Sequence, residues 1–168
     1  TGKRFFSKPY LDSSINKFII DVSVPIYDDN KIIGVLSAAI DGLWLTDQIK
    51  DIVVGKTGNC SIVGRTGITI ADKDKELVKK RINISEEAKK DATLQSLAAF
   101  IKMIVASDIS SVGYYEYEDV EYIASYATIK STGWTVIIKA PVEEFTKSID
   151  NLRWSIRILG LIILAIIL

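Results

Sequence analysis

The feature that most constrains this chain is its C-terminal stretch ILGLIILAIIL, residues 158–168, in which no side chain is charged or polar. A helix that crosses a bilayer needs about 20 mostly apolar residues, whereas a core helix of a soluble domain normally keeps one polar face. Apolar side chains surround this stretch on every side. We therefore expect it to be the start of a transmembrane helix that is cut short at Leu168, and a helix buried against a partner is the alternative.

The residue content removes several classes of function. The chain has no histidine, which excludes Ser-His-Asp and Cys-His catalysis and the usual zinc sites. Its 21 Lys and Arg are balanced by 21 Asp and Glu and are scattered, so no basic surface for nucleic acid is expected. Cys60 is the single cysteine, and we expect it to be a small buried core residue. We expect no enzymatic activity, no metal site and no cofactor.

Alternating apolar and polar residues predict that much of the chain is β-strand. Residues 16–41 alternate in this way around the turn-forming run Asp28-Asp29-Asn30-Lys31, which is typical of a β-hairpin. The further predicted elements are a helix over 43–53 ending before Gly55, a hairpin of 59–64 and 68–71, a helix over 85–107 capped by Ser85, strands over 112–118, 121–129 and 134–140, and a helix from Val142 into the apolar tail. An α+β fold, an antiparallel sheet with flanking helices, is the simplest class that accommodates this order.

Two further motifs favour structural roles. The run ADKDKE at residues 71–76 lacks the glycine and the closing glutamate of a calcium loop, so we expect a solvated loop. Five tyrosines between residues 114 and 126 are expected to pack across strands, although they could also line a pocket.

Several short motifs, taken in order, resemble the double Cache extracytoplasmic domains of bacterial receptors. These motifs are PYLD at 9–12, IIDVSVPIYD at 19–28, GVLSAAID at 34–41, GKTGNCSIVGRTGITIADKD at 55–74 and TGWTV at 132–136. The resemblance implies PAS-like Cache modules. Residues 1–54 would be the C-terminal part of a membrane-distal module with a connecting helix, 55–141 the membrane-proximal module, and 142–168 the exit helix with the start of the transmembrane helix.

The resemblance also implies ligand-binding residues. Asp41, at the end of the GV…ID strand, matches the aspartate that holds the ammonium group in amino-acid-binding members. The alternative is that Asp41 caps the helix expected near Leu43, since aspartate is a favoured N-cap. Tyr10 and Asp12 match a segment at the edge of the pocket, and their alternative role is an ordinary turn after Pro9.

The function that the resemblance implies is ligand sensing by a transmembrane chemotaxis receptor. A small molecule, with an amino acid as one option, would bind outside the cell membrane, and a homodimer would transmit the signal to cytoplasmic signalling proteins through the exit helix. The sensor region of a histidine kinase or a diguanylate cyclase is the alternative. A soluble binding module and a free-standing enzyme are further readings, and the missing histidines argue against the enzyme.

Overall fold

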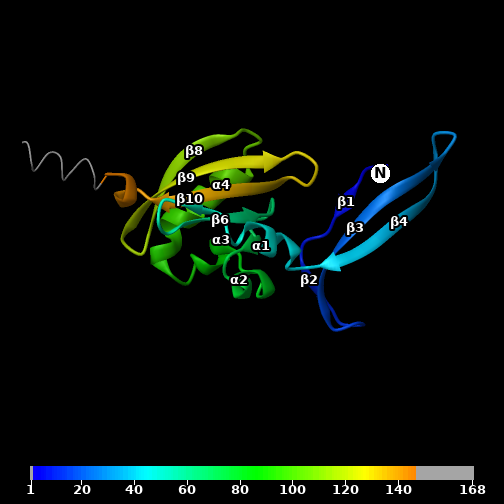
Figure 1. Ribbon diagram of the computed structural model, residues 1–168, viewed down its shortest axis with the longest axis horizontal. Coiled ribbons are helices and arrows are strands. Elements are labelled where there is room, and N and C mark those ends of the chain that lie inside the picture. The colour runs from blue at the N-terminus through cyan, green and yellow to red at the C-terminus, as the bar shows by residue number, and fades with distance from the viewer. Residues whose placement is uncertain (1, 147–168) are drawn as a thin grey trace, which may run out of the picture.

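The computed structural model describes residues 2–146 and consists of two antiparallel β-sheets with short helices (Figure 1). The first sheet, sheet A, is formed by residues before Gly42, and the second, sheet B, by residues after Ile52. The long hairpin of sheet A projects away from sheet B in Figure 1. The predicted mixture of antiparallel sheet and flanking helices is therefore confirmed, whereas the predicted division into domains stays a prediction.

Sheet A is built around the hairpin that the sequence predicts. β3 (Lys17–Asp28) pairs from Ile19 onward with β4 (Lys31–Asp41), and its other edge pairs with β2 (Tyr10–Asp12) and β1 (Phe5–Phe6). Asp29 and Asn30 both have positive φ angles, which aspartate and asparagine tolerate in a tight hairpin turn.

Sheet B has the strand order β5-β6-β10-β9-β8, and β7 pairs with β6 beside β5. β10, the last strand within residues 2–146, therefore lies in the middle of the sheet. The bounds are β5 Val53–Val54, β6 Gly58–Val63, β7 Thr69–Asp72, β8 Ser111–Tyr117, β9 Val120–Ile129 and β10 Trp134–Pro141.

The helix α4 (Gln95–Val105) covers one face of sheet B (Figure 1). Ile104 and Phe100 of this helix are buried among Tyr115, Tyr126 and Ile137. The opposite face carries a second apolar cluster around Trp134, because successive side chains of a strand point to opposite faces. Sheet B thus contributes to two apolar layers.

The second cluster also connects the two sheets. α1 (Trp44–Ile49) follows β4 directly and packs Ile49 into this cluster. Phe6 of β1 meets Trp134 edge to face, with ring centroids 6.2 Å apart. The Lys8 ammonium donates a hydrogen bond of 2.8 Å to the Thr66 hydroxyl. The N-terminal segment is therefore in contact with sheet B as well as with sheet A.

Several predicted helix boundaries are wrong. The helix predicted over 85–107 is divided into α3 (Ile84–Glu87), the 3₁₀ turn η1 (Ala92–Leu94) and α4, and the cap of α3 is Asn83 rather than Ser85. Asp91 starts a new helical segment at η1, because its side chain accepts a hydrogen bond from the backbone N–H of Thr93. The predicted loop at 71–76 contains the end of β7 and the start of α2 (Lys75–Lys79), which is capped by Asp74.

Among residues 2–146 no helix is long and apolar enough to cross a membrane. Residues 143–146 are helical, in agreement with the predicted exit helix. The predicted transmembrane stretch, residues 158–168, lies outside the described residues.

Candidate functional site

The strand register of sheet A brings two of the predicted site residues together. Tyr10 of β2 pairs with Ile19 of β3, and Ile19 pairs with Asp41 of β4. Directly paired residues point to the same face, so Tyr10 and Asp41 share one face of the sheet. They are two strand spacings apart, or about 10 Å. Asp21, two positions after Ile19, lies on the same face.

A hydrogen bond fixes the Tyr10 side chain on this face. The Tyr10 hydroxyl donates to Oδ2 of Asp21 over 2.6 Å. This hydrogen bond, together with the negative charge of Asp21, raises the pKa of Tyr10 to about 12. Asp21 escaped the sequence analysis, although it was detectable as a charged residue within a largely apolar strand, FIIDVSV.

Asp41 is the last residue of β4 and lies just before α1. Its Oδ1 accepts a hydrogen bond of 2.7 Å from the backbone N–H of Leu43. The N-cap position of α1 is Leu43 itself, so Asp41 stabilises the turn before the helix and is not the cap residue. The Asp41 side chain is exposed and needs only one of its oxygens for this turn.

Asp12 ends β2, and its side chain stabilises the turn that follows. Its Oδ1 accepts hydrogen bonds from the backbone N–H and the hydroxyl of Ser14. These bonds lower the pKa of Asp12, because they stabilise the ionised carboxylate. Asp12 pairs with Lys17 at the end of β2, on the same face as Tyr10.

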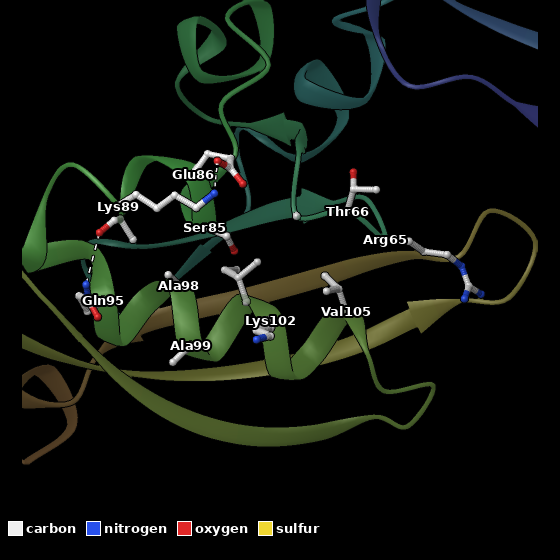
Figure 2. Close-up of a pocket in the computed structure, with 13 residues that line it drawn as sticks. Arg65, Thr66, Ser85, Glu86, Lys89, Gln95, Ala98, Ala99, Lys102 and Val105 are labelled. Atoms are coloured by element: carbon white, nitrogen blue, oxygen red, sulfur yellow. Dashed lines mark hydrogen bonds and ion pairs between the residues drawn. The ribbon is translucent and has the colours of Figure 1, made fainter.

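A groove of about 610 Å³ lies on another part of the molecule, between α3 and α4 (Figure 2). Figure 2 shows Ser85 and Glu86 from α3, and Lys89 from the turn after it, facing Ala98 and Lys102 from α4. Lys89 forms an ion pair of 2.6 Å with Glu86. The groove contains none of the predicted site residues, and its charge pair joins α3 to the turn that follows it.

Sheet B holds a partly buried pair of charged residues that the sequence analysis also missed. Lys139 of β10 pairs with Asn59 of β6, and Asp72 of β7 pairs with the neighbouring Ser61. Burial lowers the pKa of Lys139 and raises the pKa of Asp72, and in each case the opposite charge counteracts part of the effect. Within residues 2–146, Oδ1 of Asn59 is buried without a hydrogen-bond partner.

The sulfur and carboxylate groups of residues 2–146 form no cluster that could hold a metal ion. Cys60 is 1% exposed, and burial raises the pKa of its thiol, as expected for a core residue. The Tyr10–Asp41 face itself offers carboxylates and a hydroxyl, which can form charge-assisted hydrogen bonds.

Solved structures show where this fold recurs. The extracellular domain of the putative histidine kinase mmHK1S-Z2 superposes with a TM-score of 0.62 at 18% identity, covering 86% of this chain and 52% of that one. The ligand-binding domain of the Pseudomonas fluorescens chemoreceptor CtaA with L-leucine gives 0.61 at 17% identity, covering 86% and 56%. The ligand-binding domain of the Campylobacter jejuni chemoreceptor Tlp3 with L-norvaline superposes with a TM-score of 0.57 at 22% identity, covering 85% of this chain and 49% of that one. The chain thus spans about half the length of these structures, and at such identities the likeness concerns the fold alone.

A search of curated proteins gives no match. The model of one domain family, described as Cache domain, matches residues 1–149. This match covers both sheets and the connecting helix α1, in agreement with the resemblance seen in the sequence. The chain belongs to the double Cache family of Cache domains.

Proposed function

We propose that this chain is the extracytoplasmic ligand-sensing region of a transmembrane chemotaxis receptor. The observation that carries the proposal is the shared face of sheet A, where Tyr10, Asp21 and Asp41 lie together in a chain of the Cache family. Asp41 and Tyr10 would contact the ligand, and Asp12 would lie at the edge of the site. The exit helix would carry the signal through the membrane to cytoplasmic partners, with the receptor acting as a homodimer.

The proposed ligand is an amino acid, because this face offers acceptors for an ammonium group. The free oxygen of Asp41 can accept one N–H of a ligand, and the charge of Asp21 lies on the same face. Carboxylate–ammonium hydrogen bonds are roughly twice as strong as neutral ones. The structures of two similar chemoreceptor domains were solved with L-leucine and L-norvaline, which supports this ligand class.

Binding and output would be linked by a shift between two conformations. A ligand can shift such an equilibrium only by its difference in affinity for the two states. No step of this mechanism needs a catalytic residue.

The experiment is calorimetric titration of the purified full gene product with a panel of L-amino acids. Replacing Asp41 by Asn should weaken the binding of the best ligand at least about tenfold, because a hydrogen bond to a charged group contributes about 1.5–3 kcal/mol. Asp51→Asn is the matched control, since Asp51 is an exposed carboxylate after α1 and outside the strands of sheet A. Equal affinity of the D41N variant and the unchanged protein would refute the assignment of Asp41.

The same ligand without its amino group makes the test independent of mutagenesis. If the ammonium group is recognised as proposed, the corresponding carboxylic acid should bind at least about tenfold more weakly, since it lacks the charge-assisted hydrogen bonds. Equal binding of the two compounds would contradict recognition of the ammonium group.

A second candidate output is a histidine kinase, and a diguanylate cyclase is a related option. The observation that favours the kinase is the similarity to the extracellular domains of mmHK1S-Z2 and mmHK1S-Z3, with TM-scores of 0.62 and 0.63. Ligand-dependent autophosphorylation of the full gene product would support the kinase. Ligand-dependent change in swimming behaviour of cells that carry the protein would support the chemoreceptor.

A further inference from the structure

We propose that Glu144 is a positioning residue that fastens the start of the exit helix to the turn between β5 and β6, and that the ligand signal passes through this contact. The inference rests on the proposed sensing function and adds to it a specific route of transmission. We name the contact between Glu144 and residues 55–57 the exit clasp.

The exit clasp is formed by three hydrogen bonds to one carboxylate. Oε1 of Glu144 accepts from the backbone N–H of Thr57 over 3.0 Å and from the Thr57 hydroxyl, and Oε2 accepts from the backbone N–H of Lys56. These bonds lower the pKa of Glu144, because they favour its ionised form. They join parts of the chain that are 87 and 88 residues apart in sequence.

The turn is shaped to receive this carboxylate. Gly55 has a φ angle of +67°, in the left-handed region that favours glycine, and a Cβ atom at this position would collide with the Glu144 carboxylate. Consecutive backbone N–H groups beside a left-handed residue form a concave site for an anion. The glycine therefore serves both the turn conformation and the close approach of the carboxylate.

Glu144 lies in the first turn of the helical residues 143–146. A glutamate in the first turn of a helix commonly interacts with the exposed N–H groups of its own helix. Here the carboxylate instead binds N–H groups of a distant turn. Its hydrogen bonds thus hold the helix against sheet B, which is the connection that a signal-transmitting helix requires.

A second contact holds the same segment on the other side. The backbone N–H of Val142 donates to the carbonyl oxygen of Glu121 in β9, over 2.9 Å. The exit segment is therefore attached to β9 through its backbone and to the β5–β6 turn through Glu144. A rotation of one attachment relative to the other would change the direction of the helix.

The exit clasp lies on a short path from the candidate ligand site. Asp41 is followed directly by α1, then by β5, and then by the turn at residues 55–57. Between them, α1 packs Ile49 into the core cluster of sheet B, so the path consists of ordered and packed segments. A displacement of Asp41 by a bound ligand can thus reach Glu144 through α1 and β5.

The first measurement is amide hydrogen exchange of the full gene product, with Glu144→Gln compared with the matched control Glu116→Gln. Glu116 is an exposed glutamate of β8. Glutamine keeps the shape but removes the charge and places N–H donors against the turn, so the amides of Lys56 and Thr57 should exchange about tenfold faster in E144Q. In E116Q they should exchange as in the unchanged protein.

The second measurement separates ligand affinity from output. In E144Q the Kd for the ligand should stay within about twofold, whereas the amplitude of the ligand-dependent output should fall at least about fivefold. Thr57→Val removes a single hydrogen bond with little change of shape and should lower the amplitude less. This graded loss at constant affinity is not expected from a residue that only stabilises the fold.

Full output amplitude in E144Q, or unchanged exchange at Lys56 and Thr57, would overturn the inference. A loss of amplitude in E116Q equal to that in E144Q would overturn it as well. If the full gene product bound no ligand, the proposed function would fail, and the exchange measurement would still decide whether the clasp exists.

Discussion

Phe100 is one of the buried residues by which α4 packs onto sheet B. It is 4% exposed and lies against two aromatic rings, with centroid distances of 5.0 Å to Tyr115 and 5.9 Å to Tyr126. Its ring also fills the space above Gly113, where a Cβ would approach Cε2 of Phe100 to 2.8 Å. Replacing Phe100 by Ala removes the ring from the centre of this core.

The cost of Phe100→Ala has two parts. Truncation of a buried Phe to Ala reduces the free energy of unfolding by about 3–5 kcal/mol, because apolar burial is lost and a cavity remains. The ring pairs with Tyr115 and Tyr126 add about 0.5–1.5 kcal/mol each to what is lost, which favours the upper end of the range. Since single domains have total stabilities of about 5–15 kcal/mol, a loss of about 5 kcal/mol would remove at least about a third of the stability.

Urea unfolding followed by tyrosine and tryptophan fluorescence measures this cost. Phe100→Leu is the milder companion, expected to lose about 1.5 kcal/mol because most of the volume is kept. Met103→Ala is the control on the same helix, since Met103 is 49% exposed, and it should lose less than about 0.5 kcal/mol. If F100A were destabilised no more than M103A, the placement of α4 on the sheet would be wrong.

Three further predictions concern groups with shifted pKa values. Burial lowers the pKa of Lys139, so the free energy of unfolding should rise as the pH increases toward about 10.4, by at most about 1.4 kcal/mol per pH unit. Urea unfolding at several pH values measures this rise, which should be absent in Lys139→Met. Removing the acceptor of the Tyr10 hydroxyl by Asp21→Ala should return the pKa of Tyr10 from about 12 toward about 10 in an ultraviolet titration, and an unchanged titration step near 12 would contradict the hydrogen bond. Cys60 should react with maleimide only after unfolding in urea, because it is buried and burial raises the pKa of its thiol; fast labelling of the native protein would show that β6 is accessible.

The strands of this fold were predictable because their signal is local. The hairpin over residues 16–41 and the strands of sheet B follow from alternation and from turn residues such as Asp29 and Asn30. The helices were predicted less well. The apolar pattern from Leu94 to Val105 was recognised, but residues 85–107 were read as one helix, because the competing cap at Asp91 is a local hydrogen bond within an otherwise helical stretch.

The candidate site was predictable only in part. Asp41 and Tyr10 came from the resemblance to the family, and the register that places them on one face is a property of three paired strands. Asp21 joins them through a hydrogen bond to Tyr10, which a pattern within one strand does not reveal. Glu144 and Lys139 interact with segments far away in sequence, so only the folded chain shows what they contact.

The same backbone hydrogen-bond pattern occurs where the chain leaves the last strand of each sheet and enters the following helical segment. In sheet A, Asp41 pairs with Ile19, and the next N–H, from Gly42, donates to the carbonyl oxygen of Phe18. In sheet B, Pro141 pairs with Tyr122, and the next N–H, from Val142, donates to the carbonyl oxygen of Glu121. A hairpin followed by a helical segment therefore occurs twice, once leading from sheet A into α1 and once leading from sheet B into residues 143–146.

The repeated hairpin unit explains how the two attachments can act in series. Each hairpin holds the start of its helical segment by one backbone hydrogen bond from the residue that follows its last strand, so a twist of the hairpin would turn the segment that follows. In the first unit the Asp41 carboxylate binds the adjacent N–H of Leu43, which keeps it beside the candidate ligand face. In the second unit Glu144 binds the turn that α1 and β5 lead to. The end of α1 is thereby attached through β5 to the start of the second helical segment, and under the proposed function a ligand bound on sheet A would need no contact with sheet B to move that segment.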